Sequence, residues 1–185
     1  MPSDHNIESV RLMLPRLTLV LGGAASGKSV CAEGLVAQTS DARLYLATAQ
    51  AHDDEMRAKL ARHRARRGRE WRTIEAPLDP GPALASAQAT EAVLLDCVTM
   101  WLSNHLLADS DLAEAEAALI EALARCAAPV VVVSNEVGLS VVPENALARR
   151  FQTAQGALNQ RLAAEAGLVV NVIAGLPQVL KGHLP

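Results

Sequence analysis

The sequence predicts an α/β fold, a three-layer sandwich with a mostly parallel central sheet. Short apolar runs alternate along the chain with longer segments of helical pattern, as in proteins built from repeated strand–helix units. Several of these runs are continuously apolar, which is typical of strands that helices cover on both faces. The chain has 185 residues, 50% of them hydrophobic, so it can bury one sizeable core.

The predicted strands are short apolar segments bounded by turn residues. The first ends at Gly22 and Gly23, the fourth ends at Asp96, and the run PVVVVS that begins at Pro129 is the clearest of the set. The predicted strands cover residues 17–21, 43–48, 71–75, 92–96, 129–134 and 168–173. The pattern does not predict their order in the sheet.

Helical segments are predicted between these strands. Asp53 and Asp54 are well placed to cap the second helix and to complement its dipole. Three prolines, Pro77, Pro80 and Pro82, predict a loop after the third strand. The predicted helices cover residues 29–38, 53 to about 67, 99–107, 111–126 and 144–166.

Residues 17–185 are predicted to form a single catalytic domain, preceded by an extension over residues 1–16 that we expect to be flexible. The extension contains Asp4, Glu8 and Pro15 and lacks the apolar stretch of a signal peptide. No apolar run reaches the length needed to cross a bilayer, so we expect a cytoplasmic protein without a membrane span.

Composition argues against two classes of function. The net charge of -3 and a pI of about 5.9 do not suit a surface that binds nucleic acid. Only four aromatic residues occur, too few for a platform on which bases stack. The three cysteines are scattered, which predicts reduced thiols rather than disulfides or a zinc site.

One motif predicts nucleotide binding. Its residues match G-x-x-x-x-G-K-[ST], between a predicted strand and a predicted helix: Gly22, Gly23, Ala24, Ala25, Ser26, Gly27, Lys28 and Ser29. Glycines let the backbone curl so that its N–H groups point at phosphate oxygens, and the helix N-terminus adds partial positive charge. Lys28 can reach the β- and γ-phosphates, and the Ser29 hydroxyl can ligate Mg²⁺. The fold is therefore predicted to be of the P-loop NTPase type.

Asp96 is the candidate second residue of the magnesium site, because it ends a predicted strand. The alternative is that this carboxylate only caps the helix that follows. No N-K-x-D motif for reading guanine is present. Ser134, Asn135 and Glu136 end a suitable strand but lack its Lys and Asp, which argues against a regulatory GTPase.

A basic segment surrounds one histidine. Eight of the 17 Lys and Arg residues lie between Arg57 and Arg72, and His63 falls on the same predicted helix face as Met56 and Leu60. Nearby cations keep an imidazole neutral and attract a triphosphate, so His63 is a candidate nucleophile toward a nucleotide α-phosphorus. The alternative is a structural histidine.

His52 is the rival candidate. It lies beside Asp53 and Asp54, a poor setting for handling a polyphosphate. A further alternative is that the basic residues from Arg57 to Arg72 only form a solvated helix face. This alternative is weaker, because Glu70 is the one acidic residue among them that could pair with the basic side chains.

Six ordered segments carry a family resemblance over residues 17–181. They read GGAASGKS, YLATA, DDEMRAKLARHRARRG, WRTIEAPLD, LLDCVTMWLSN and SNEVGLSVVPENALARRFQTAQGALNQRLA. Together they resemble the bifunctional adenosylcobinamide kinase / adenosylcobinamide-phosphate guanylyltransferase family of cobalamin biosynthesis. The resemblance implies phosphorylation of adenosylcobinamide by ATP or GTP. It then implies guanylylation of an enzyme histidine by GTP, transfer of GMP to adenosylcobinamide phosphate, and release of pyrophosphate.

The resemblance also implies roles for individual residues. His63 matches the guanylylated histidine, and Lys28 and Ser29 lie in the matching phosphate loop. The further nucleotide contacts that it implies are Ala47, Thr48, Ala49, Arg64, Ala65, Arg66, Arg67, Glu75 and Asp96. It implies a homo-oligomer, with a trimer as the favoured assembly. Two positions depart from the family pattern: Ala25 stands where an Arg is usual, and Ser140 where a Gly is usual.

Two other functions share the phosphate loop and stay open. One is a small-molecule kinase with a single activity, in which His63 is structural. The other is a nucleotide-binding regulator without chemistry of its own.

Overall fold

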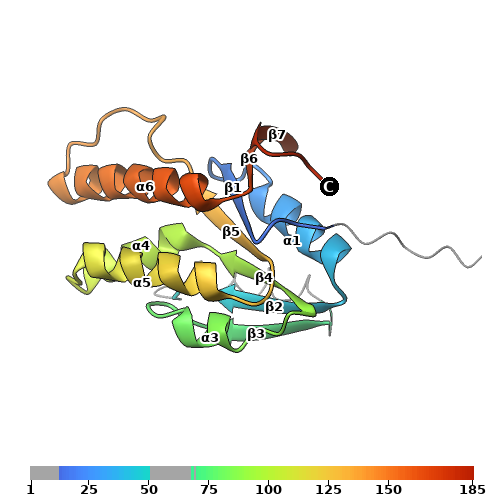
Figure 1. Ribbon diagram of the computed structural model, residues 1–185. Coiled ribbons are helices and arrows are strands. Elements are labelled where there is room, and N and C mark those ends of the chain that lie inside the picture. Colours follow the sequence, from blue (N-terminus) through green and yellow to red (C-terminus); the bar gives the residue numbers. More distant parts are fainter. Residues whose placement is uncertain (1–12, 51–67, 69) are drawn as a thin grey trace, which may run out of the picture.

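The computed structural model describes residues 13–50, 68 and 70–185. Within these residues, seven strands form one sheet in the order β3-β2-β4-β5-β1-β6-β7 (Figure 1). The strands are β1 (Leu17–Gly22), β2 (Ala42–Ala47), β3 (Trp71–Glu75), β4 (Glu91–Asp96), β5 (Val130–Asn135), β6 (Leu168–Ile173) and β7 (Leu176–Lys181). All neighbouring pairs are parallel except β6 and β7. The predicted mostly parallel sheet is confirmed.

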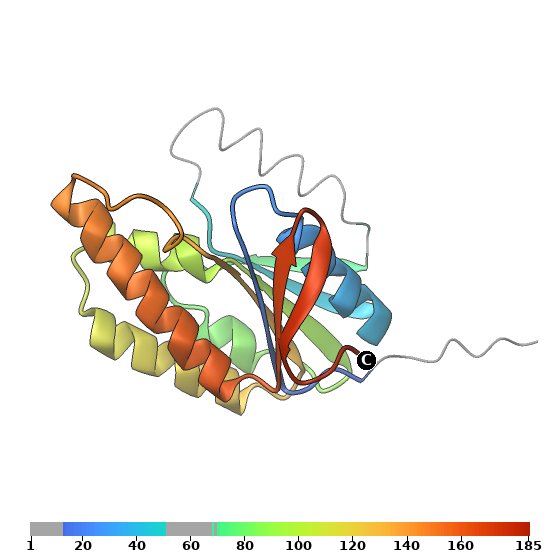
Figure 2. The ribbon, with the colours of Figure 1, turned by 90° about the horizontal axis from the view of Figure 1, so that it is seen from above.

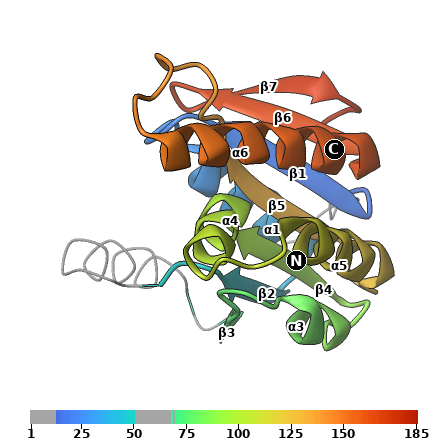
Figure 3. The same cartoon turned by 90° about the vertical axis from the view of Figure 1, so that its left-hand side faces the viewer.

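Helices cover both faces of this sheet. The helices of the described residues are α1 (Lys28–Thr39), α3 (Gly81–Ala85), α4 (Val98–Leu107), α5 (Leu112–Arg125) and α6 (Ala146–Glu165). In Figure 2 the blue α1 and the orange α6 lie on opposite sides of the strands, and Figure 3 shows α4, α5 and α6 in front of the sheet. The three-layer prediction is therefore confirmed. None of these helices combines the length and the apolar composition that crossing a bilayer requires.

The central strand β5 shows why the apolar runs are continuous. Val130 and Val132 belong to the core beneath α4, α5 and α6, whereas Val131 and Val133 belong to the core beneath α1. Side chains alternate between the faces of a strand, so a strand buried on both faces needs apolar residues at every position. Both cores are built mainly from Leu, Val and Ala, as the scarcity of aromatic residues requires.

Two elements differ from the predicted pattern. Helix α3 lies within the segment predicted as a loop, because Pro82 occupies the first turn of a helix, where its missing N–H is not needed. Strand β7 follows a two-residue turn in which Ala174 and Gly175 both have positive φ, 51° and 78°. All six β7 residues are exposed, so no alternation of buried and exposed positions marks the strand.

Polar side chains fix the starts of two helices near their predicted positions. The Asp111 carboxylate accepts from the N–H groups of Ala113 and Glu114 at the start of α5, and the Asn145 side chain caps α6 in the same way. The predicted helix over residues 53–67, with Asp53 and Asp54, lies outside the described residues, as do residues 1–12 of the predicted extension.

Candidate nucleotide-binding site

The phosphate loop joins β1 to α1 at the carboxyl edge of the parallel strands, the edge where ligands of such sheets bind. Its base is held by both neighbours of β1. The Glu136 N–H donates to the Gly22 carbonyl over 3.1 Å, and the Gly175 N–H donates to the Ser26 carbonyl over 2.8 Å. The loop is therefore attached to β5 on one side and to the β6–β7 turn on the other.

Glycine is required at two loop positions for different reasons. Gly27 has φ +93°, and a Cβ there would lie 3.1 Å from Gly175 Cα. A Cβ on Gly22 would lie 2.7 Å from the Val172 carbonyl oxygen and closer still to Ser26 Oγ. The loop curls tightly at its base, while Gly23 faces open space.

Lys28 is buried at the mouth of the loop, with 9% of its surface exposed. Its Nζ donates to the Gly23 carbonyl over 2.9 Å, which folds the side chain back over the loop. Helix α1 has no side-chain cap and no acidic residue in its first turn. Its first N–H groups have no partner within the helix, and its partial positive charge is not neutralised locally, so both are available to a phosphate.

Asp96 ends β4, and its carboxylate accepts from the Tyr45 hydroxyl over 3.1 Å. It does not cap α4, because the cap residue of that helix is Cys97. The alternative interpretation of Asp96 as a cap is therefore wrong. Strand β5 separates β4 from β1, so Asp96 lies two strand spacings from the phosphate loop, or roughly 10 Å.

The residues at this edge fit Mg²⁺ held mainly by substrate and water. Among the described residues, no group of three or more His, Cys, Asp or Glu side chains could enclose a metal. Mg²⁺ usually keeps several waters and binds one or two protein groups together with phosphate oxygens. The Ser29 hydroxyl and the Asp96 carboxylate have the hard oxygen chemistry that such a site needs.

Ala47, Thr48 and Ala49 end β2 and lead away from it, and Thr48 is fully buried. The Thr48 hydroxyl donates to the Cys97 carbonyl over 2.7 Å and accepts from the Cys97 N–H over 2.9 Å. The Thr48 carbonyl accepts from Asn104 Nδ2 over 2.8 Å. Thr48 thus connects the ends of β2 and β4, and we propose that it positions Asp96 rather than contacting a nucleotide through its side chain.

Replacing Thr48 by valine should destabilise the fold by about 2–3 kcal/mol, because it leaves the buried N–H and carbonyl of Cys97 without partners. The midpoint of urea unfolding measures this loss. Thr48→Ser keeps the hydroxyl and should cost only about 1 kcal/mol for the lost methyl group. Equal midpoints for Thr48→Val and the wild type would contradict the role of this hydroxyl.

The Cys97 thiol beside Asp96 is not a nucleophile at neutral pH. Burial and then the negative charge of Asp96 raise its pKa to about 11. Hydrogen bonds from the backbone of Met100 and Thr99 and the positive charge of Lys28 act in the opposite direction and do not overcome burial. None of the three cysteines forms a disulfide, as predicted.

The remaining predicted site residues are not brought to the loop by the described structure. Glu75 is exposed at the end of the edge strand β3, four strand spacings from β1, or roughly 19 Å. His63 and the following Arg64, Ala65, Arg66 and Arg67 lie outside the described residues, and so does His52.

The two departures from the family pattern have different surroundings. Ala25 is exposed at the tip of the loop with φ 55°, and none of the described residues replaces an arginine there. Ser140 Oγ donates to the Val137 carbonyl over 3.2 Å and accepts from Gln152 Nε2 over 3.2 Å. Ser140 therefore helps attach the β5–α6 loop to α6, a contact that glycine could not make.

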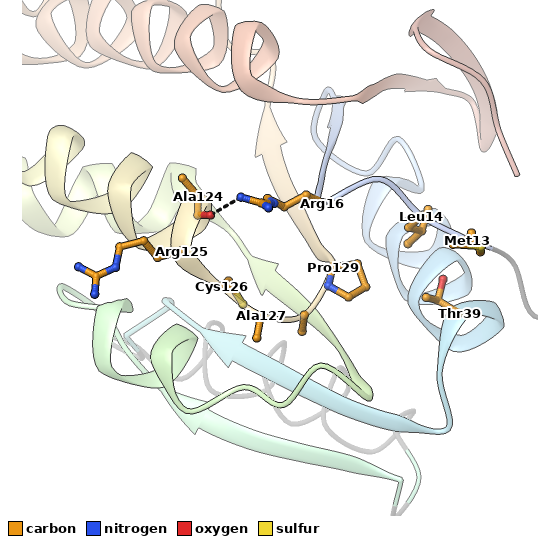
Figure 4. Close-up of a pocket in the computed structure, with 10 residues that line it drawn as sticks. Met13, Leu14, Arg16, Thr39, Ala124, Arg125, Cys126, Ala127 and Pro129 are labelled. Carbon is orange, nitrogen blue, oxygen red and sulfur yellow. Dashed lines mark hydrogen bonds between the residues drawn. The ribbon is translucent and has the colours of Figure 1, made fainter.

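A cavity of about 560 Å³ lies away from this site (Figure 4). Arg16 and Pro129, which line it, directly precede β1 and β5, so the cavity is at the amino edge of these strands. The Arg16 guanidinium donates there to the Ala124 carbonyl over 2.7 Å. Because phosphate loops operate at the opposite edge, this cavity is not the nucleotide site.

Sequence reasoning did not predict two polar groups at the carboxyl edge, the Tyr45 hydroxyl on Asp96 and the Asn135 side chain. Tyr45 is the first residue of the YLATA segment and lies two residues before Ala47, the last residue of β2, so the two side chains share a face of the strand. Asn135 ends β5 and pairs in register with Gly22. The signal for Asn135 was present, because a polar residue directly follows a buried run of valines and a serine.

Comparison with known proteins is informative over nearly the whole chain. A family model described as cobinamide kinase / cobinamide phosphate guanyltransferase matches residues 18–180. The bifunctional adenosylcobalamin biosynthesis protein CobP of Pseudomonas aeruginosa is 47% identical over 168 residues, covering 89% of this chain and 97% of that protein. The corresponding CobU of Escherichia coli is 41% identical over 181 residues, with 89% and 99% covered.

A solved structure supports the fold alone. An ATPase of a bacterial type III secretion system is 11% identical and superposes with a TM-score of 0.58, covering 90% of this chain and 57% of that one. The similarity is to the α/β architecture of that protein, in agreement with the sheet described above.

Proposed function

Because the chain belongs to the cobinamide kinase / cobinamide phosphate guanyltransferase family, we propose that it acts twice on one corrinoid substrate. It is an enzyme with kinase and guanylyltransferase activities. In the first reaction it phosphorylates adenosylcobinamide from ATP or GTP. In the second it transfers GMP from GTP to adenosylcobinamide phosphate. The observation that carries this proposal is a phosphate loop with a buried lysine, in a chain that matches this family over residues 18–180.

In the kinase step the chain supplies position and charge. The N-terminus of α1 and the curled loop bind the phosphates, and Lys28 leaves the Gly23 carbonyl to meet the β- and γ-phosphate oxygens. Mg²⁺, held by Ser29 and Asp96, would neutralise phosphate charge. The hydroxyl oxygen of adenosylcobinamide attacks the γ-phosphorus and its proton passes to solvent, while the bond to the β-phosphate oxygen breaks and a nucleoside diphosphate leaves. Transfers of this type need little covalent chemistry from the protein.

In the second step we propose that a His63 nitrogen attacks the α-phosphorus of GTP. A nitrogen–phosphorus bond forms, the bond from the α-phosphorus to the bridging oxygen breaks, and pyrophosphate leaves. A phosphate oxygen of adenosylcobinamide phosphate then attacks the same phosphorus, releasing the imidazole and giving adenosylcobinamide-GDP. The basic residues Arg64, Arg66 and Arg67 next to His63 in the sequence support this assignment, because cations attract the triphosphate and disfavour protonation of the histidine.

We also propose a cytoplasmic homo-oligomer, with a trimer as the favoured assembly. Exposed apolar side chains support association: Leu139 and Val141 of the β5–α6 loop are 92% and 91% exposed, and Leu176 of β7 is 72% exposed. Isolated monomers seldom expose such groups in number.

Radiolabelled GTP tests the proposal directly. With adenosylcobinamide and Mg²⁺, [γ-³²P]GTP should label the corrinoid. With [α-³²P]GTP alone, the protein should acquire an acid-labile, alkali-stable label that moves to adenosylcobinamide phosphate when this is added. Transfer from the γ-position without any α-label would indicate a kinase with a single activity. Tight nucleotide binding with neither transfer would indicate a regulator.

A further inference from the structure

Asn135 ends β5, the strand that lies between the two halves of the candidate site. On one side, β1 carries the phosphate loop, and Gly22 pairs in register with Asn135. On the other side, β4 ends at Asp96, which pairs with Val133. Asn135 therefore lies one strand spacing from the start of the loop, about 5 Å, and about 8 Å diagonally from Asp96.

The Asn135 side chain lies on the same face of the sheet as the loop and α1. Val131 and Val133 belong to the core beneath α1, and alternation along the strand places Asn135 on that face. Asp96 follows Leu94 of the same core by two residues, so it also belongs to this face. Asn135, Asp96 and the phosphate loop thus surround one region above the carboxyl edge.

The backbone of Asn135 is held from the opposite face of the sheet. Its N–H donates to Thr99 Oγ1 over 2.8 Å, and its carbonyl accepts from Asn159 Nδ2 over 3.2 Å. Asn159 is itself fixed, because its Oδ1 accepts from Ser134 Oγ and from Gln155 Nε2 over 2.5 and 3.0 Å. This polar network holds the backbone from which the Asn135 side chain extends.

The side-chain oxygen of Asn135 is left without a partner among the described residues. Among the described residues, Asn135 Oδ1 is buried and accepts no hydrogen bond, and the buried Ser26 Oγ of the loop also has none. Buried polar groups are nearly always paired in folded proteins. A phosphate oxygen accepts hydrogen bonds, so it can pair with the Ser26 hydroxyl and with the amide N–H groups of Asn135, but not with the amide oxygen. A half-turn about the Cβ–Cγ bond exchanges the amide oxygen and nitrogen of Asn135, and the donors then occupy the unpaired position beside the loop.

We propose that Asn135 is a further phosphate-contacting residue, whose side-chain amide donates to a γ-phosphate oxygen of the bound triphosphate. The inference rests on the proposed function for the identity of the acceptor substrate, but the contact itself needs only a nucleoside triphosphate. The strand order supports the γ-phosphate in particular. A triphosphate whose β-phosphate lies on the loop and whose metal contacts Asp96 must extend across the end of β5, where Asn135 lies.

Equilibrium binding of two nucleotides isolates this contact from catalysis. Dissociation constants for GDP and for the β,γ-imido analogue of GTP, both with Mg²⁺, are measured by calorimetry for the wild type and for Asn135→Ala. A hydrogen bond to a charged acceptor accounts for roughly tenfold or more in affinity. Asn135→Ala should lower the preference for the triphosphate over the diphosphate about tenfold, with GDP affinity within about twofold of the wild type.

Two further variants keep the test decisive. Asn135→Asp, of nearly the same shape, replaces the donor by a negative charge and should lose at least as much of the preference as Asn135→Ala. Asn171→Ala is the matched control: Asn171 lies in β6 on the other side of β1 and alternates with the α1-side residues Val170 and Val172, so the preference should stay unchanged.

An unchanged preference in both Asn135 variants would overturn the proposal. So would an equal loss of GDP and triphosphate affinity together with a lower unfolding midpoint, because that is the pattern of a purely structural residue. If the wild type binds nucleotides with the expected preference but transfers no phosphoryl group to adenosylcobinamide, the proposed function fails while the Asn135 contact stands.

Discussion

Lys28→Ala is expected to remove nearly all of the kinase activity, with a fall in kcat of roughly 100- to 1,000-fold. The lysine provides the one buried ammonium group at the mouth of the described loop, and removing a single charge-stabilising donor of this kind costs roughly 100- to 1,000-fold. Initial rates of transfer from [γ-³²P]GTP to adenosylcobinamide measure the loss. Guanylylation should also be impaired if one phosphate loop serves both reactions.

The matched control for this variant is Lys181→Ala. Lys181 ends β7 and donates to the carbonyls of Ala163 and Ala164 at the end of α6, so its loss should affect stability slightly and transfer not at all. Full retention of both activities in Lys28→Ala would contradict the shared site. Loss of the kinase alone would indicate that GTP binds elsewhere for guanylylation, for example nearer Glu75.

His63→Ala should separate the two reactions. Without the nucleophile, labelling of the protein by [α-³²P]GTP and formation of adenosylcobinamide-GDP should fall at least about 1,000-fold, whereas phosphorylation of adenosylcobinamide should stay within a few-fold of the wild type. The label is measured on denatured protein before and after acid treatment, which cleaves a phosphoramidate. His52→Ala is the control, because it removes the rival histidine of the same segment.

The two histidine variants must differ for the assignment to hold. A label that persists in His63→Ala and disappears in His52→Ala would transfer the role to His52. Loss of both activities in His63→Ala, with an unchanged unfolding midpoint, would indicate that the histidine also acts in the kinase step.

The parts of the fold that the sequence predicted are those in which local pattern and tertiary packing agree. The valine run of β5 is continuous because both faces are covered, and Asp111 marks the start of α5 because its carboxylate satisfies N–H groups that the helix leaves unpaired. Strand β7 was missed because an exposed edge strand with a proline has no hydrophobic alternation. The order of the strands is set by long-range contacts that no local pattern contains.

The residues of the candidate site also differ in whether local sequence pattern can predict them. The phosphate loop could be proposed from the sequence because its chemistry requires a contiguous set of residues, and in the structure these residues connect β1 to α1. Thr48 and Asn135 could not be assigned in this way, because their roles depend on partners far away in the sequence, Cys97 and Asn104 for Thr48, and Thr99 and Asn159 for Asn135.

Strand β7 has a consequence for how the protein resists aggregation. An edge strand with free N–H and carbonyl groups is a template on which a strand of another molecule can pair. Pro177 removes one donor from β7, and a register irregularity interrupts its pairing with β6 at Val169 and Val170. Both features disfavour pairing of β7 with a strand of a second copy of the protein. Association across this edge would therefore rely on exposed side chains such as Leu176 and Leu180 rather than on backbone hydrogen bonds between strands.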